Sequence, residues 1–355
     1  MTLLAKTIKR IEPLDEEAMA KARERLEQLT MPYWALGRLM DLALELAGMT
    51  RSVRPEVENR TVVIMAGDHG VVDQGVSKYP REVTAQMVRN FINGGAGISA
   101  MARVADAEVV VVDMGVASDL DHLVEQGLLI SRKARPGTFD MSVGPAMTRE
   151  EAAQSVEAGI ELALELADTT QIFGTGDMGI GNTTPSSAIV ASITGSDPKE
   201  VTGRGTGIDD EQLTHKIEVI ERSLHVNKPD PRDPLDVLAK VGGFEIGGIA
   251  GLILGAASAR RPVVIDGFIS TAGALIAHGL HPMAADYMIA AHLSVERGHR
   301  IALDYLGKKP LMQLDLRLGE GTGAALAMTL VEAAYRILTE VATFEEAAVS
   351  TAEGS

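Results

Sequence analysis

Four short runs of apolar, mostly β-branched residues, each ending in a glycine-rich turn, constrain the fold of this 355-residue chain most strongly. They are TVVIMA at 61–66, AEVVVVDMG at 107–115, QIFGTG at 171–176 and RPVVIDG at 261–267. Runs that are apolar throughout, without polar alternation, are typical of parallel strands buried on both faces. They therefore predict a sheet that is covered by helices on both sides.

Helical patterns lie between and around these runs. Asp15 begins a charged helix that extends to about Leu29, and Pro32 begins a second helix with one apolar face. Further helices are predicted over 82–91, from Thr148 with a capping box to Glu151, from near Thr183, after Asp209 and Asp210, and from about 284 to 340 with a break near 307–323. Strands alternating with helices predict an α/β fold with a doubly wound, mostly parallel sheet.

Composition excludes several classes of protein. The formal net charge is -16 and no dense run of Lys and Arg occurs, so nucleic-acid binding is not expected. The chain has no cysteine, which excludes disulfides, thiolate zinc sites and cysteine nucleophiles. The first residues lack the apolar stretch of a signal peptide, and no run of about 18 apolar residues predicts a membrane span. We therefore expect a cytoplasmic protein.

The strongest local motif is GTGDMGIGNTT at 174–184, which follows a predicted strand and precedes a predicted helix. Glycines let the backbone approach a phosphate, and a helix N-terminus supplies N–H donors and the positive end of a dipole. The frame from Gly176 to Thr183 resembles a P-loop, but Asn182 occupies the position of the P-loop lysine, which excludes an ATPase. The alternative is a tight strand–helix turn without a ligand.

A second glycine-rich turn, GRGTG at 203–207, precedes Asp209, and Lys216 lies about two turns into the following helix. Backbone amides of the glycines, with charge from Arg204 or Lys216, could hold a monophosphate. Glycine-rich helix starts are common, so this turn predicts a phosphate site only together with the first one.

Glu320 stands between two glycines in LDLRLGEGTG at 314–323, flanked by apolar residues. Desolvation raises the proton affinity of a carboxylate in such a place, which suits a general base. The alternative is a helix N-terminal Glu near Thr322.

Other signatures are weak or absent. The polar loop at 67–80 contains Asp68 and His69, a pair that is more often structural than a metal site. HExxH and GxSxG do not occur, and a clear GxGxxG fingerprint with an acidic residue about 20 positions on is lacking, which leaves zincin, hydrolase and dinucleotide-dependent oxidoreductase functions without support. The acidic pair and Thr-Gly loop of diphosphate-dependent phosphoribosyltransferases are missing too, so magnesium is not implied.

Taken together, the motifs resemble those of the nicotinate-nucleotide:dimethylbenzimidazole phosphoribosyltransferase family, over nearly the whole chain and in order. The matching stretches are AGDHGVVDQGVSKYPREVTAQMVRNF at 66–91, KARPGTFDM at 133–141, FGTGDMGIGNTTPSSAI at 173–189, GRGTGIDDE at 203–211, VGGFEIGGIAG at 241–251, PVVIDGFISTAGALIA at 262–277, HLSVERGHR at 292–300 and LDLRLGEGTGAALA at 314–327.

The resemblance implies transfer of ribose 5-phosphate from nicotinate mononucleotide to 5,6-dimethylbenzimidazole, which yields α-ribazole 5′-phosphate and nicotinate. It implies small-molecule substrates, no metal or organic cofactor, and a homodimer. It also implies a large α/β domain and a small helical domain from both termini. We expect the small domain over 1–30 and 285–345, the large domain over 31–284, and a flexible tail over 346–355.

The resemblance also implies roles for particular residues. The catalytic base falls on Glu320, and a second active-site acid falls on Asp177, where most members are expected to have Glu. The implied phosphate and nicotinate sites comprise Gly179, Gly181, Asn182, Thr183, Gly203, Arg204, Gly205, Thr206, Gly207 and Lys216, and the implied acceptor pocket comprises Ser77, Tyr79, Gln86 and Leu318.

Two alternatives stay open. Asp177 is one methylene shorter than Glu, so the same transfer to a phenol, another benzimidazole or adenine is the first alternative. The second is a catalytically silent subunit that binds nucleotide and pairs with an active homologue. The presence of Glu320 argues against the silent subunit.

Overall fold

The computed structural model describes residues 1–205 and 207–350. Within them, six parallel strands form one sheet in the order β3-β2-β1-β4-β5-β6. The strands are β1 Arg60–Gly67, β2 Ala107–Gly115, β3 Ile130–Ser131, β4 Ile172–Met178, β5 Val263–Ile265 and β6 Met288–Ala290. The chain adds strands on one side of β1 and then on the other, so the direction of winding changes between β1 and β4. Open α/β sheets of this kind bind ligands at the carboxyl ends of the strands beside that switch point.

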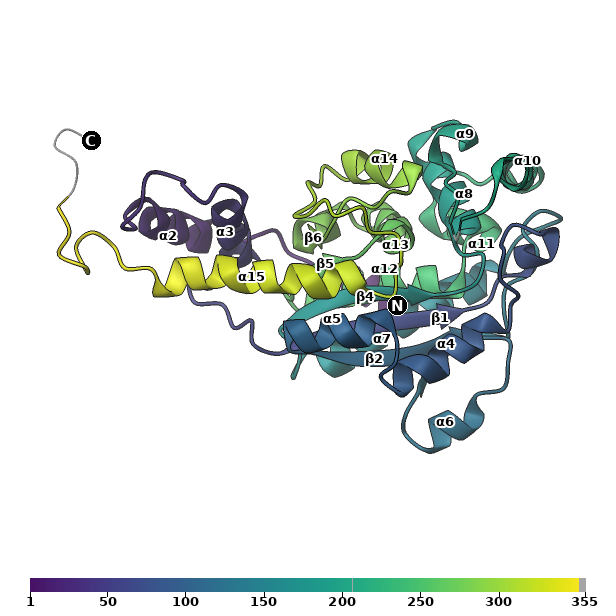
Figure 1. Cartoon of the computed structure of the whole chain (residues 1–355), viewed down its shortest axis with the longest axis horizontal. Helices are drawn as coiled ribbons and strands as arrows, with labels where there is room; N and C mark the ends of the chain where they lie inside the picture. Colours follow the sequence, from purple (N-terminus) through teal and green to yellow (C-terminus); the bar gives the residue numbers. More distant parts are fainter. Residues whose placement is uncertain (206, 351–355) are drawn as a thin grey trace.

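The helices are α1 Leu3–Ile8, α2 Glu16–Glu27, α3 Arg38–Thr50, α4 Val83–Ile92, α5 Gly97–Ala105, α6 Asp121–Glu125, α7 Arg149–Leu166, α8 Thr183–Thr194, α9 Pro198–Val201, α10 Asp210–Asn227, α11 Pro234–Val241, α12 Phe244–Ser258, α13 Phe268–Leu280, α14 Arg297–Tyr305 and α15 Thr322–Glu340, with short 3-10 helices η1 Gly70–Gln74 and η2 Pro282–Tyr287. Helices α4, α5 and α15 pack on one face of the sheet, and α12, backed by α7, packs on the other (Figure 1). The doubly wound α/β prediction is thus confirmed.

Two of the three N-terminal helices pack against the far half of the last helix, whereas α1 packs against α7 and α12. Helices α2 and α3 both contact α15, whose first half reaches β4 and β5 (Figure 1). Leu29 forms an antiparallel bridge with Thr343, and Arg25 pairs with Glu346 at 2.9 Å. The division into two domains stays a prediction. No helix among the described residues is both long and apolar enough to cross a membrane.

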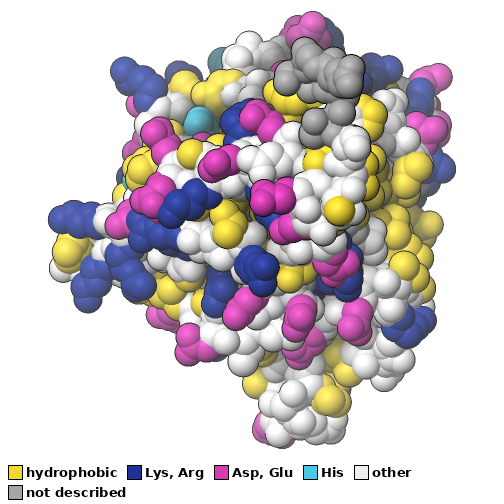
Figure 2. All heavy atoms as spheres, turned by 90° about the vertical axis from the view of Figure 1, so that its left-hand side faces the viewer, with side chains coloured by type: hydrophobic (Ala, Val, Ile, Leu, Met, Phe, Trp, Pro, Cys, Tyr) yellow, Lys and Arg dark blue, Asp and Glu magenta, His cyan; other side chains and the backbone are white. Residues whose placement is uncertain are grey.

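The surface at this end of the molecule carries charges of both signs. Figure 2 shows it from the side of α2 and α3, with acidic and basic side chains interspersed among hydrophobic ones. Such a mixture differs from the basic face that nucleic-acid binding requires.

Most predicted elements are confirmed, two need correction and one short strand was not predicted. The second helix begins at Arg38 and not at Pro32, because Trp34 and Gly37 have φ angles of 51° and 48°, which a right-handed helix cannot contain. Residues 288–290, predicted as helix, form strand β6 beside β5. Strand β3 was not predicted at all; with two residues it is too short to produce a pattern.

Candidate active site

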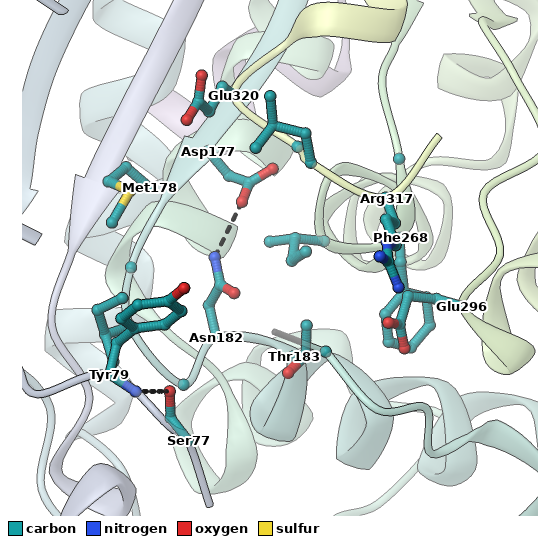
Figure 3. Close-up of a pocket in the computed structure, with 18 of the residues that line it drawn as sticks. Ser77, Tyr79, Asp177, Met178, Asn182, Thr183, Phe268, Glu296, Arg317 and Glu320 are labelled. Carbon is teal, nitrogen blue, oxygen red and sulfur yellow. Dashed lines mark hydrogen bonds between the residues drawn. The ribbon is translucent and has the colours of Figure 1, made fainter. Parts of the chain in front are cut away.

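A cavity of about 710 Å³ opens at the carboxyl ends of the strands, beside β1 and β4, where the winding changes direction. Its wall comes from the loop after β1, the first half of α4, the β4–α8 turn, the β5–α13 turn and two segments near the C-terminus, 292–296 and 317–320. Gly205 and Gly207, before α10, and Lys216, on α10, complete it. Segments far apart in the sequence therefore meet where the topology predicts a ligand site. Figure 3 shows Glu320 at one end of this cavity and Thr183 toward the other, with Asp177 and Asn182 between them.

The end of the cavity near Thr183 is suited to an anion. Thr183 begins α8, and Gly179 and Gly181 lie in the turn just before it, so the positive end of the helix dipole is at the wall. Lys216, from α10, is 1% exposed and donates from Nζ to Thr183 Oγ1 at 2.7 Å. Burial lowers the pKa of Lys216 to about 8, although Glu296 opposes this. A bound phosphate would favour the charged ammonium.

Glu320 is held in a strained turn at the other end. Its φ angle is 62°, and its neighbours Gly319 and Gly321 have φ angles of 81° and 84°. The left-handed region is costly for a glutamate and persists only where surrounding contacts impose it. The carboxylate lies against the N-terminus of α5, where Oε2 accepts from the Ile98 N–H at 3.4 Å. Burial raises the pKa of Glu320, and the charge of Asp266 raises it further.

Asp266 imposes that turn. It follows β5, and its two carboxylate oxygens accept from the Gly321 N–H at 3.2 Å and from the Ala324 N–H at 3.0 Å. The backbone N–H of Asp266 is in turn bonded to Thr175 Oγ1 at 3.0 Å. Asp266 thus ties the segment that carries Glu320 to the ends of β4 and β5.

Asp177 lies between the two ends of the cavity. Its Oδ2 accepts from Asn182 Nδ2 at 2.9 Å, and its Oδ1 has no hydrogen-bond partner among the described residues (Figure 3). Burial raises the pKa of Asp177 well above its ordinary value, and the charges of Asp266, Glu245 and Glu320 add to this effect. Asp177 therefore holds its proton more tightly than an exposed aspartate does.

The structure brings most of the predicted site residues together. Ser77, Tyr79, Asp177, Gly179, Gly181, Asn182, Thr183, Gly205, Gly207, Lys216, Leu318 and Glu320 all line the cavity. Of the described residues, three do not: Gln86 is exposed on α4, Gly203 is packed against Glu296, and the exposed Arg204 pairs with Asp210. Thr206 lies outside the described residues.

Other wall residues were not predicted for the site individually, although some lie in the motifs HLSVERGHR and LDLRLGEGTG. They are Val76, Val83, Met87, Met178, Ile180, Gly267, Phe268, Ile269, His292, Ser294, Glu296, Arg317 and Gly319. The Ser294 N–H donates to His299 Nδ1 at 2.9 Å, and burial lowers the pKa of His299 to about 3. The neutral ring can therefore accept this bond, which holds Ser294 in place at the cavity wall. No cluster of three or more His, Asp or Glu suited to a metal occurs in the part of the chain that the structure describes.

Comparisons with known proteins show the family to which the chain belongs. The model of a family described as phosphoribosyltransferase matches residues 11–349, which defines the class of the chain. The chain is 63% identical to the nicotinate-nucleotide–dimethylbenzimidazole phosphoribosyltransferase of Syntrophotalea carbinolica, over 99% of each chain. It is 55% identical to the enzyme of that name from Desulfotalea psychrophila, over 99% of this chain and all of the other. It therefore belongs to the nicotinate-nucleotide–dimethylbenzimidazole phosphoribosyltransferase family.

Solved structures agree as well. The crystal structure of the phosphoribosyltransferase of this name from Thermus thermophilus superposes with a TM-score of 0.89 at 48% identity, covering 96% of this chain and all of the other. A crystal structure of CobT from the same organism gives a TM-score of 0.90 at 49% identity, over 95% of this chain and all of the other.

Proposed function

We propose that this protein transfers ribose 5-phosphate from nicotinate mononucleotide to 5,6-dimethylbenzimidazole, giving α-ribazole 5′-phosphate and nicotinate for assembly of the cobalamin nucleotide loop. One observation carries the proposal beyond the likeness to named relatives. A single cavity holds an anion site around Thr183 and Lys216 at one end and the buried carboxylate of Glu320 at the other. This matches a donor with a phosphate and an acceptor that must lose a proton.

Bond changes in the reaction are few. A benzimidazole nitrogen attacks C1′ of the ribose while the C1′–nitrogen bond to nicotinate breaks, and the bonding pair returns to the pyridinium nitrogen, which becomes neutral. The other benzimidazole nitrogen loses its proton to Glu320, which later releases it to solvent. The pyridinium leaves without an acid, so the protein mainly positions two partners and accepts one proton.

Asp177 is proposed to face the ribose. Positive charge develops on the ribose in the transition state, and an ionised carboxylate stabilises it. The pyridinium of the donor is itself a cation, so its binding should draw the Asp177 proton off and oppose the effect of burial. The remaining anion contacts are proposed from Gly205, Gly207 and Lys216, which line the wall.

The acceptor is proposed to bind near Ser77, Tyr79 and Leu318, beside the apolar wall residues Val83 and Met87. Apolar side chains with a few polar groups suit a flat bicyclic base. Tyr79 and Leu318 are 52% and 60% exposed in the single chain. We further propose that the protein is a homodimer and that it is cytoplasmic. Light scattering after gel filtration would test the homodimer.

The decisive experiment incubates purified protein with nicotinate mononucleotide and 5,6-dimethylbenzimidazole, with and without EDTA, and follows both products by liquid chromatography and mass spectrometry. Acceptor-dependent release of nicotinate, unaffected by EDTA, is the expected result. Product with a phenol or adenine but not with dimethylbenzimidazole would contradict the acceptor and direct attention to Asp177. No product with any acceptor would refute the catalytic proposal and favour a silent subunit.

A further inference from the structure

Directly behind the cavity wall lies a pair of polar side chains that the reaction does not use. His69 follows β1 and Glu245 lies in the first turn of α12, and Nε2 of the ring is 2.7 Å from Oε1 of the carboxylate. The two side chains are 1% and 0% exposed. A hydrogen-bonded pair this deeply buried is expensive unless its charges balance.

Three glycines enclose the pair, one from each adjoining segment. A Cβ added to Gly67, at the end of β1, would lie 2.9 Å from Glu245 Oε2, and one added to Gly243, the N-cap of α12, would lie 2.5 Å from His69 Cε1. A Cβ on Gly179, in the β4–α8 turn, would lie 2.4 Å from the Gly67 carbonyl and 3.2 Å from His69 Nε2. No side chain fits between the pair and these backbones.

Gly179 connects the pair to the substrate site. It lines the cavity on one side, while its other side packs against the His69 ring. Asp177 lies two residues earlier, and the charge of Glu245 contributes to its raised pKa. The pair therefore lies outside the cavity wall, yet it supports the turn that holds Asp177.

The charges around the pair decide its protonation. Glu245 and the adjacent Asp68 favour a proton on the ring, and Arg81 opposes it. Burial alone would lower the pKa of His69, but the carboxylates outweigh burial and the pKa is raised. Neither His69 Nδ1 nor Glu245 Oε2 has a hydrogen-bond partner among the described residues, so the contact between Nε2 and Oε1 alone must balance the pair.

We propose that His69 and Glu245 form a buried imidazolium–carboxylate pair that positions the donor-binding turn through Gly179 and cancels the charge of Glu245 beside Asp177. Both are positioning residues and not catalytic ones. The pair's effect on turnover rests on the proposed function, whereas its ionisation can be measured without any substrate.

The first test observes wild-type protein labelled with ¹⁵N-histidine by NMR, without substrate. The His69 signal is assigned by its absence from a His69→Gln sample. If that variant does not fold, backbone-to-side-chain correlations assign the signal. The expected result is an imidazolium at pH 7, with both ring nitrogens protonated. A neutral His69 ring at pH 7 overturns the proposal, whether or not the enzyme transfers ribose phosphate.

The second test compares His69→Gln with the double variant His69→Gln/Glu245→Gln. The single change leaves a buried carboxylate unbalanced, so kcat/KM for the donor should fall about tenfold or more and its acid limb should move to higher pH. The double variant removes that charge and should return the limb toward the wild-type position, while His122→Gln should change neither. An acid limb that stays unmoved in folded His69→Gln overturns the proposal.

Discussion

Replacement of Glu320 by glutamine is the perturbation that tests the active site most directly. Glutamine keeps the size of the side chain and can still accept from the Ile98 N–H with its amide oxygen, so the turn fixed by Asp266 should persist. It cannot accept a proton at neutral pH. General-base catalysis contributes about 10²- to 10⁴-fold to rate, so kcat should fall by about that factor while KM for the donor changes little.

The assay measures nicotinate release at saturating donor and acceptor, from pH 5 to 9. Glu340→Gln is the matched control, because Glu340 is the last residue of α15, the helix that follows Glu320. Its side chain pairs with Arg336 and is 56% exposed. The control should retain wild-type turnover. Turnover within about threefold of wild type in folded Glu320→Gln would refute the assignment of Glu320 as the base.

The same substitution has a stability signature of known sign. Burial raises the pKa of Glu320, so the folded state binds its proton more tightly than the unfolded state does. An ionised Glu320 therefore destabilises the fold, and this cost appears as pH rises from the unfolded pKa through the raised folded pKa. Glu320→Gln should raise Tm at pH 8 and lose that advantage at acid pH, as differential scanning calorimetry would show. A lowered Tm at pH 8 would contradict the buried-carboxylate geometry.

Three further predictions follow from individual contacts. Lys216→Met removes a charge-assisted contact worth about 1.5–3 kcal/mol, so KM for the donor should rise about 10- to 150-fold. In the wild type, the donor KM should rise as pH passes about 8, the pKa of Lys216, because the lysine then loses its charge. A wild-type KM independent of pH from 7 to 9 would contradict the phosphate role. Asp266→Asn leaves one acceptor oxygen for the N–H groups of Gly321 and Ala324, so kcat should fall about tenfold or more with little change in KM for the donor. An unchanged kcat would exclude a role of Asp266 in positioning Glu320. Thr148→Ala removes the capping box of α7 and should cost about 1 kcal/mol in urea unfolding without affecting turnover; no loss of stability would contradict the cap.

The long elements of the fold could be predicted because their sequence patterns are local. Strand β2 coincides with the apolar run at 107–115, and the caps at Asp15 and Thr148 mark where α2 and α7 begin. Strand β6 has three residues and exists only because β5 pairs with it, so no periodicity within the segment could indicate it. Helix α3 begins at Arg38, later than predicted, because Trp34 and Gly37 have positive φ angles. The spacing of apolar residues in the sequence carries no information on these backbone angles.

The site residues also divide into those with a local sequence signal and those whose role depends on contacts distant in the sequence. Glycine-rich turns predicted Gly179 and Gly181, because a tight approach of backbone to ligand needs glycine within a short segment. Asp266 was missed because its function depends on N–H groups 55 and 58 residues away in the sequence. An acidic residue at the carboxyl end of a buried strand, in VVIDG, was the available signal.

The crowding of acids at the switch point suits a donor whose reacting ring carries a positively charged pyridinium nitrogen. Asp266, Glu245 and Glu320 all raise the pKa of Asp177, so this part of the cavity disfavours another negative charge. Under the proposed function the donor brings a pyridinium nitrogen beside Asp177, and the attraction of this positive charge to the carboxylates offsets their mutual repulsion. When the C1′–nitrogen bond breaks, that positive charge moves from the ring to the ribose and then disappears. The departing nicotinate is an anion among carboxylates, so the field that favours donor binding also favours release of this product.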